Sequence, residues 1–243
     1  QWGSVPVRGN VGIQVQRADQ EGFGLRTFAD NAAGDPVSDG VSYTEVLPSA
    51  NLIFDVTEEQ KLRLGLGRQL ARPRIDDMSA GFGFGINQAT QRWEAGGGNP
   101  RLRPWIANAF DVSYEKYFGG KGYVSAAWFF KDLKSYVYNQ VLEFDFTGLP
   151  VPSGAQLPPT NIGTINSPAN GEGGLIAGWE FAVSIPFELF WEPLEGFGLQ
   201  GHYTDTRTGI SPNGPGTSEP LPGFSKYTSN VTLYWERFGW GVR

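Results

Sequence analysis

Aromatic and arginine side chains in two stretches of the chain, 101–105 and 136–138, could together bind a polar ligand. An aromatic face stacks on a sugar ring, and a guanidinium donates paired hydrogen bonds to hydroxyls or to anionic groups. The set therefore suits a saccharide and equally an anionic complex. We expect the ligand contacts to come from Arg101, Arg103, Trp105, Tyr136 and Tyr138.

Catalytic and metal-binding arrangements are not indicated by the sequence. His202 is the only histidine and there is no cysteine, so the chain lacks the clusters of these residues that hold zinc. Asp76-Asp77 and the pair Asp35 and Asp39 lack the spacing of an EF-hand calcium loop. No Gly-x-Ser-x-Gly elbow is present, which argues against a hydrolase. We expect no catalytic site, no metal and no cofactor.

The composition favours strands and turns. The 243 residues include 34 glycines and 17 prolines, and 14% of the residues are aromatic. No run approaches the roughly 18 consecutive apolar residues of a membrane helix. The formal net charge of −6 argues against a nucleic-acid partner, because proteins that bind nucleic acids carry basic surfaces. The chain is therefore predicted to be all-β.

Apolar and polar residues alternate along the predicted strands. The clearest case is 61–68, where three leucines interleave with Arg63 and two glycines. Because side chains of a strand point alternately to its two faces, each strand has one apolar and one polar face. The apolar face is predicted to contain Leu62, Leu66, Phe110, Val112, Phe181, Val183, Leu199, Val231 and Leu233. The polar face is predicted to contain Arg63, Asp111, Glu115, Glu180, Gln200 and His202.

Short and long connections alternate between these strands. The short ones are 57–60, 119–122, 191–197 and 236–239, and aromatic residues cluster beside three of them. The long ones are polar and cover roughly 19–40, 69–106, 135–171 and 206–222. A transmembrane barrel has tight turns on one rim and long loops on the other, with aromatic girdles at the membrane interfaces.

This alternation predicts an antiparallel transmembrane β-barrel fragment with about nine membrane strands. Residues 81–86 are expected to form a small extra hairpin outside the membrane, because their connection must return to the rim where it started. Nine is an odd number, whereas bacterial single-chain barrels have even numbers of strands. We therefore expect a piece of a larger barrel, in the form of an open, curved sheet with two unpaired edges.

A second interpretation stays open at this point. The chain could be a soluble or surface β-rich module for carbohydrate binding or adhesion, which would use the same aromatic residues. In such a fold the apolar face of the sheet packs on a closed core. It would bury Leu62, Leu64 and Leu66, whereas a membrane barrel leaves them facing lipid.

Segment 98–104, Gly-Asn-Pro-Arg-Leu-Arg-Pro, resembles the Gly-Asn-Pro-x-Leu-x-Pro signature in the barrels of TonB-dependent outer-membrane receptors. Segments 47–52, 68–73, 178–180 and 221–226 are similar to segments of that family in the same order. The resemblance covers nearly the whole chain and identifies residues 1–243 as a single domain, the middle-to-late part of such a barrel, truncated at both ends. Barrels of this family have roughly 22 strands and a plugged lumen.

The resemblance implies a function, a location and partners. Receptors of this family are not enzymes; they import a scarce ligand, a carbohydrate or a siderophore-type compound, across the cell outer membrane of Gram-negative bacteria. The implied partners are outer-membrane lipid, a small-molecule or oligosaccharide ligand, the receptor's own plug domain and the TonB complex. The plug and the segment that meets TonB belong to an N-terminal part that this sequence does not include.

Two further expectations concern the lumen and the outer loops. On the lumen side, Arg63, Glu180, Gln200 and His202 are expected to contact the plug. The polar segment 139–170 contains five prolines and no lysine or arginine. Long loops of this kind often carry binding residues, so it is expected either to bind ligand or to form a flexible extracellular cover.

Overall fold

The computed structural model describes residues 5–29, 34–119, 121–149, 151, 154, 156–211 and 218–243. In this part of the chain, eleven strands form one sheet and three short 3-10 helices lie in the connections. The strands are β1 (Val7–Phe28), β2 (Asp35–Thr57), β3 (Gln60–Ala71), β4 (Phe82–Asn87), β5 (Arg92–Gly97), β6 (Trp105–Phe118), β7 (Gly122–Asp145), β8 (Ile162–Pro186), β9 (Phe197–Ile210), β10 (Tyr227–Arg237) and β11 (Trp240–Val242). The helices are η1 (Ile75–Met78), η2 (Phe187–Leu189) and η3 (Glu192–Leu194). None of these described helices is long and apolar enough to cross a membrane.

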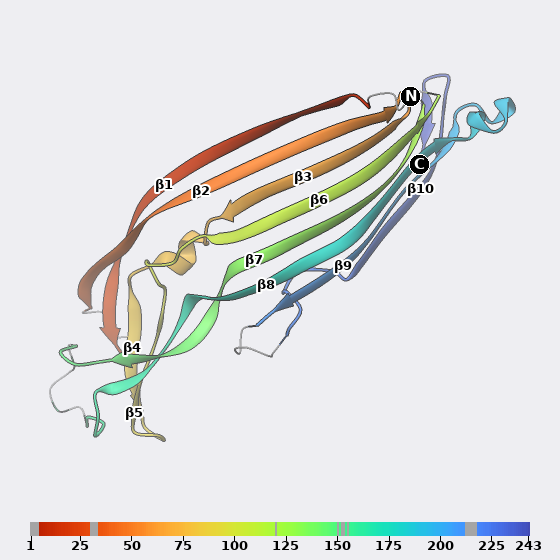
Figure 1. The fold of residues 1–243 in the computed structure, drawn as a ribbon. Helices are drawn as coiled ribbons and strands as arrows, with labels where there is room; N and C mark the ends of the chain where they lie inside the picture. Colours follow the sequence, from red (N-terminus) through yellow and green to blue (C-terminus); the bar gives the residue numbers. More distant parts are fainter. Residues whose placement is uncertain are drawn as a thin grey trace.

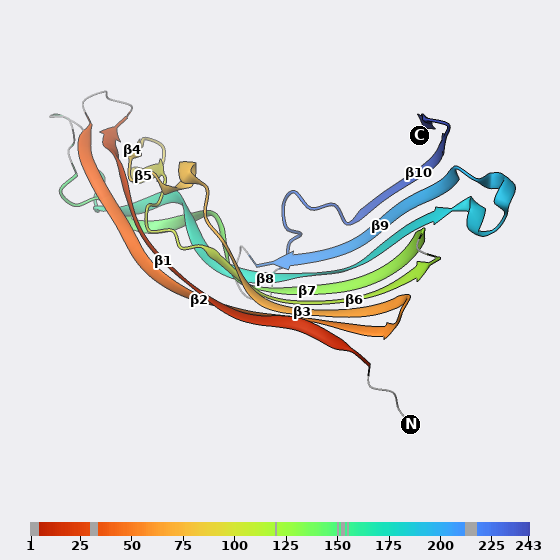
Figure 2. The ribbon, with the colours of Figure 1, turned by 90° about the horizontal axis from the view of Figure 1, so that it is seen from above.

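All strands except β4 and β5 form a continuous wall. β1, β2, β3 and β6 to β11 lie in chain order, and each pairs antiparallel with the next. Figure 1 shows the long strands running side by side, and Figure 2 shows that the wall is curved. The described residues thus confirm the predicted all-β barrel fragment with about nine membrane strands.

The register of the wall places the two predicted residue sets on opposite faces. Leu64 lies opposite Val112, and Arg63 lies opposite Ser113. The same alternation continues across every pair of strands from β3 to β10. A slip of one residue would exchange the faces of a strand, because its side-chain period is two. The apolar set therefore shares the convex face, and the polar set shares the concave face.

Apolar side chains on the convex face are open to the surroundings. The exposed fraction is 54% for Leu66, 70% for Val231 and 80% for Val11. In water such a face is unfavourable, since each Å² of exposed apolar surface costs about 25 cal/mol. Leu62 and Leu64 are partly exposed, and neither buried apolar cluster of the described residues includes Leu62, Leu64 or Leu66. The soluble alternative required a closed core over these leucines, and the described wall has none there.

Strands extend well into two of the segments predicted as long loops. β7 and β8 remain paired from Tyr123 and Ser184 as far as Asp145 and Ile162. β1 and β2 remain paired until a few residues before the connection 29–34. The prediction of loops over 19–40 and 135–171 is therefore wrong for most of each segment. Antiparallel pairing uses backbone groups, so polar sequences can continue it beyond the apolar belt. Within the fourth long connection, 212–217 lie outside the described residues.

An extra hairpin is present at the long-loop end of the wall (Figure 1), but it is longer than predicted: β4 occupies nearly all of the segment 81–86, and β5 pairs antiparallel with it. β4 pairs in parallel with the end of β1, and β5 pairs in parallel with β8, through three residue pairs each. These pairings close a ring of eight strands in the order β1-β2-β3-β6-β7-β8-β5-β4. The expectation of a fully open sheet is therefore wrong at this end. Between Val7 and Leu25, β2 is the only strand that pairs with β1 among the described residues.

An aromatic cluster explains why the hairpin docks there. Phe82, Phe84 and Ile86 alternate with glycines, so β4 has one apolar face that needs a covering surface. Phe84 packs with Trp93 and Phe146 in a buried cluster. Trp93 is only 3% exposed, and its ring stacks on that of Phe146 with 5.4 Å between centroids. The burial of these rings fixes the hairpin against the tip of β7.

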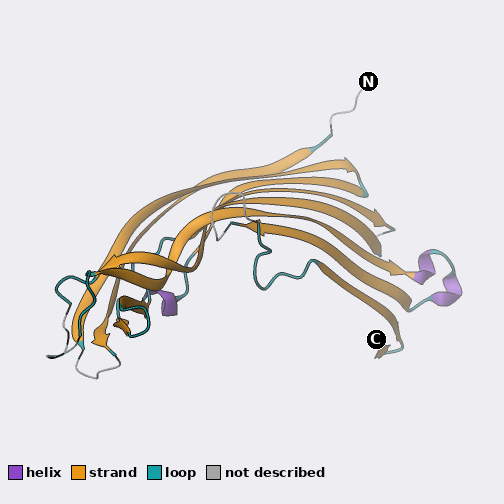
Figure 3. Cartoon of the chain, turned by 90° about the horizontal axis from the view of Figure 1, so that it is seen from below, coloured by secondary structure: helices purple, strands orange, loops and turns teal. Residues whose placement is uncertain are grey.

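The short-turn end has one larger connection, between β8 and β9, which contains η2 and η3 (Figure 3). Lys121 Nζ lies 2.5 Å from Glu188 Oε1, and Arg237 Nη2 lies 2.8 Å from Glu195 Oε2. The hydrogen bond from the Lys121 ammonium holds the pKa of Glu188 below its usual value, and the same contact raises the pKa of Lys121. These ion pairs tie the connection to the turns on both sides of it.

Candidate functional site

Residues 98–104 form a strap that crosses from β5 to β6 at the long-loop end of the wall. Pro100 and Pro104 fix the backbone and remove two N–H donors, so the segment continues neither strand. Leu102 and Pro104 are fully buried. The chain that precedes the hairpin also packs closely on β1, where a Cβ atom on Gly24 would lie 2.2 Å from the backbone nitrogen of Gly81. The strap is therefore a packed element of the structure.

Side-chain amides from β1 and β8 hold the backbone of the strap. Gln20 Nε2 donates to the carbonyl oxygens of Pro100 at 2.9 Å and Leu102 at 2.7 Å. Asn170 Oδ1 accepts from the N–H of Arg103, and Asn170 Nδ2 donates to the Arg103 carbonyl oxygen, both at 2.8 Å. The strap is thus hydrogen-bonded on one side to β1 and on the other side to β8.

Two of the predicted ligand contacts, Arg101 and Arg103, lie on the strap itself. Both residues are exposed. Arg101 Nε lies 2.7 Å from Oδ2 and 2.9 Å from Oδ1 of Asp39, on β2. The guanidinium of Arg101 is therefore already engaged by a carboxylate, whereas no ion pair of Arg103 occurs among the described residues.

The three predicted aromatic contacts form a row beside the strap. The ring centroids of Trp105 and Tyr136 are 4.6 Å apart, and those of Tyr136 and Tyr138 are 6.1 Å apart with an angle of 25° between the rings. Trp105 Nε1 is buried and has no hydrogen-bond acceptor among the described residues. Such a donor costs about 1–3 kcal/mol when it stays unpaired. The fold therefore brings the aromatic residues together and leaves one of their polar atoms unsatisfied.

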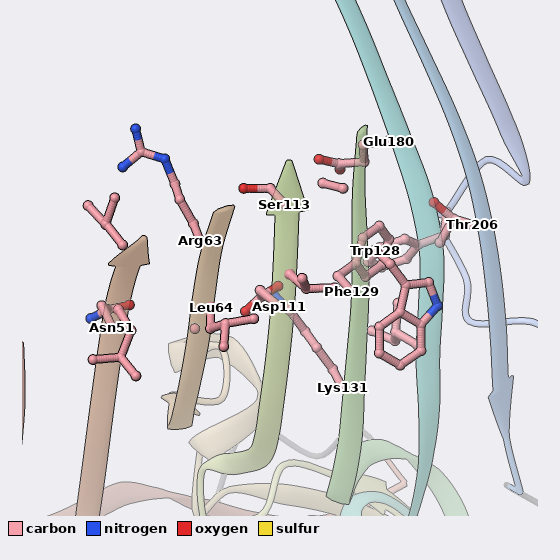
Figure 4. Close-up of a pocket in the computed structure, with 17 residues that line it drawn as sticks. Asn51, Arg63, Leu64, Asp111, Ser113, Trp128, Phe129, Lys131, Glu180 and Thr206 are labelled. Atoms are coloured by element: carbon pink, nitrogen blue, oxygen red, sulfur yellow. The ribbon is translucent and has the colours of Figure 1, made fainter. Parts of the chain in front are cut away.

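A groove of about 660 Å³ lies on the concave face of the wall. Charged and polar side chains of neighbouring strands line it, as Figure 4 shows: Asn51, Arg63, Asp111, Lys131, Glu180 and Thr206. Arg63 makes a two-point ion pair with Glu115, with distances of 2.6 Å for Nε–Oε1 and 3.1 Å for Nη2–Oε2. No ion pair involves Asp111, Lys131 or Glu180 in the part of the chain that the structure describes.

The four residues predicted to contact a plug share the concave face but do not form one cluster. Arg63 and Glu180 line the groove. Gln200 and His202 lie farther along the wall on β9, where β10 faces them with polar residues. His202 Nε2 lies 3.2 Å from Thr204 Oγ1 in the same strand.

Three of the four acidic residues that could suggest calcium, Asp35, Asp39 and Asp76, are paired with arginines. Asp76 lies 2.9 Å from Arg74, and Asp35 pairs with Arg26. Asp39 is the partner of the strap arginine described above. Among the described residues, no group of three or more side chains could hold a metal ion.

An apolar cluster on the concave face was not predicted from the sequence. Leu221, from the connection between β9 and β10, packs on Ile176 and Ile210, and Phe129 borders the same cluster. Phe129 interrupts the alternation of β7 by placing an aromatic ring on the polar face, which is the signal for a covering segment. The amide residues that hold the strap carry no comparable signal, because isolated polar residues on a strand are common.

Two solved receptor structures share this fold. The siderophore receptor PirA from Acinetobacter baumannii has a TM-score of 0.57 and 14% sequence identity, over 83% of this chain and 28% of the receptor. A variant of the ferric enterobactin receptor PfeA from Pseudomonas aeruginosa, in complex with enterobactin, has a TM-score of 0.60 and 15% identity, over 93% of this chain and 30% of the receptor. The chain thus spans less than a third of the length of these receptors. No curated protein matches the sequence.

The sequence also matches a family of barrels along its whole length. The family is described as TonB dependent receptor-like, beta-barrel, and the match covers residues 1–243. This match agrees with the antiparallel wall, its exposed apolar face and the short turns gathered at one end. The chain belongs to the TonB-dependent receptor-like β-barrel family.

Proposed function

We propose that this chain is the middle-to-late part of the barrel of an outer-membrane receptor of a Gram-negative bacterium. The receptor imports a scarce ligand with energy delivered through the TonB complex. The observation that carries this proposal is that the sheet of this family member has two chemically different faces. One face exposes apolar side chains along strand after strand, and the other carries charged and polar groups around a groove. Lipid suits the first face, and a hydrated, plugged lumen suits the second.

The unpaired charges of the groove support a plug domain as the partner of the concave face. Asp111 and Glu180 are exposed, Lys131 is half-buried, and none of the three holds an ion pair within the described chain. A domain packed on this face would bury them, and buried charges are more stable when they are paired. A plug domain of the same receptor would supply the missing partners. Arg63 would contribute less to such a contact, because Glu115 already engages it. Gln200 and His202 would meet the plug at a separate place along the wall.

The ligand is proposed to bind along the strap and the aromatic row. Arg103 is exposed and its guanidinium is free of ion pairs among the described residues. Trp105 lies two positions later in the sequence and has a buried N–H without an acceptor there. The rings of Tyr136 and Tyr138 extend the surface. An anionic siderophore complex and a saccharide both fit this chemistry. The siderophore class has the additional support that the two similar receptors named above are siderophore receptors.

Location and ligand class can be tested separately. The full-length gene product should sediment with the outer membrane and require detergent for extraction; a product that stays soluble without detergent would refute the membrane assignment. Purified receptor should then be titrated with ferric enterobactin and with a neutral oligosaccharide. Binding of the oligosaccharide alone would replace the siderophore class by carbohydrate. Binding that survives Arg103→Ala and Trp105→Ala unchanged would move the ligand site away from the strap.

A further inference from the structure

The backbone of the strap needs hydrogen-bond partners other than a neighbouring strand, because the strap contains two prolines. Pro100 and Pro104 donate no hydrogen bond, so residues 98–104 cannot form a regular ladder with a neighbouring strand. The segment is nevertheless packed, with Leu102 fully buried. Buried backbone groups need partners, and the remaining donors and acceptors of the strap must find them outside a ladder.

Asn170 supplies such a partner in an unusual way. Its carboxamide accepts from the N–H of Arg103 and donates to the C=O of the same residue, with both distances at 2.8 Å. A residue in an antiparallel ladder makes the same two exchanges with a hydrogen-bonded neighbour. The side chain of Asn170 thus takes the place of a backbone partner and fixes both the position and the rotation of Arg103.

Gln20 performs the matching task at the other side of the strap. One amide nitrogen donates to two carbonyl oxygens, those of Pro100 and Leu102. These contacts join residues 80 and 82 positions apart in the chain. Asn99 adds a third amide contact by donating to the carbonyl oxygen of Pro168 at 3.0 Å. The three amides tie the strap to β1 and to β8, the same two strands that the hairpin joins through only three residue pairs each.

We propose that Asn170 and Gln20 are positioning residues for the ligand site. Their side-chain hydrogen bonds hold the strap between β1 and β8 and thereby fix the positions of the Arg103 side chain and the Trp105 ring. Arg101 adds a further contact of the strap, an ion pair with Asp39 on β2. A site held in this way loses little conformational freedom when a ligand binds. The role in ligand binding rests on the proposed function, but the effect of these two amides on the strap can be tested without any ligand.

Hydrogen exchange of the full-length receptor in detergent is the direct test. In Asn170→Ala, exchange at the amide of Arg103 should become at least about tenfold faster, because this N–H loses its acceptor. Asn170→Asp keeps an acceptor but places a carboxylate against the Arg103 carbonyl, so it should also accelerate exchange. The matched control is Asn166→Ala, an exposed asparagine on the same strand whose side chain makes no hydrogen bond among the described residues. This control should leave the strap unchanged.

A second readout separates positioning from general destabilisation. The emission of Trp105, obtained as the difference between each protein and its Trp105→Phe counterpart, should shift in Asn170→Ala while the unfolding midpoint changes little. Unchanged exchange in a folded Asn170→Ala receptor would overturn the proposal, and so would equal acceleration across β3 and β6. Should Asn170→Ala fail to fold, Gln20→Ala provides the same comparison at the amide of Arg103, because Gln20 holds the Leu102 carbonyl oxygen of that peptide group. A receptor that does not partition into the membrane would refute the proposed function. The exchange measurements would still show whether Asn170 and Gln20 hold the strap.

Discussion

The convex face is assigned to lipid, and Leu64→Arg tests that assignment most directly. Leu64 lies opposite Leu52 on one neighbouring strand and Val112 on the other, so an arginine there finds only apolar neighbours on its face. It lies four positions after Gln60, the start of β3. At about 3.3 Å per residue this is roughly 13 Å along the strand, or about 10 Å of depth for a strand tilted by about 35–45°, well inside an apolar band of about 25 Å.

The expected cost follows from that depth. An arginine near the bilayer midplane of a barrel costs about 2–4 kcal/mol. Since about 1.4 kcal/mol corresponds to a factor of ten, the ratio of folded to unfolded receptor should fall roughly 30- to 700-fold. The full-length receptor refolded into lipid vesicles would reveal this in a urea titration, with folded and unfolded protein separated by their mobility in unheated gels.

Gln200→Arg is the matched control because it adds the same side chain on the opposite face. Gln200 is exposed on the concave side, between the small polar residues Ser184 and Thr232 of the neighbouring strands. An arginine there remains in a polar surrounding, so stability should change by less than about 1 kcal/mol. Equal tolerance of both arginines would refute the assignment of the convex face to lipid, and with it the physical basis of the transport proposal.

Three further predictions concern the ion pairs and the hairpin. Glu115→Gln should lower the free energy of unfolding by about 1–2 kcal/mol, because Arg63 loses its charged partner; a double-mutant cycle with Arg63→Met that gives no coupling would contradict this. The pKa of Glu188 is lowered in the folded protein, so its pair with Lys121 stabilises above the ordinary carboxyl pKa and stops doing so as the pH falls through the lowered value. The difference in Tm between the wild type and Lys121→Met should therefore shrink from about pH 7 to about pH 3, and a constant difference would argue against the pair. Trp93→Ala should cost the docked hairpin about 3–5 kcal/mol, seen as faster hydrogen exchange in β4 and β5 alone; faster exchange throughout the wall would show that the hairpin is not a separate unit.

The two faces of the wall could be predicted because they depend on a pattern within each strand. A strand repeats every two residues, so Leu62, Leu64 and Leu66 interleaved with Arg63 define two faces without knowledge of any neighbour. The alternation of short and long connections then orders the strands, since tight turns force antiparallel neighbours. The presence of an extra hairpin followed from the number of times that the chain must change direction, although its second strand, β5, lies outside the predicted segment 81–86. Segment 98–104 could be recognised as a motif, although its sequence does not reveal what its backbone contacts.

Tertiary structure decided the contacts between residues that are far apart in the chain. The partner of Arg101 is Asp39, 62 positions away, and the partner of Arg103 is Asn170, 67 positions away. Neither contact can be predicted from a local sequence pattern, because a single polar residue on a strand can face solvent or bind a distant group equally well. The closure of the ring by β4 and β5 has the same origin: the apolar face of the hairpin indicates that a covering surface exists, but only the packing of Trp93 on Phe146 determines which surface it is. Backbone pairing likewise extends β7 and β8 through polar sequence, since hydrogen bonds between strands do not depend on side-chain polarity.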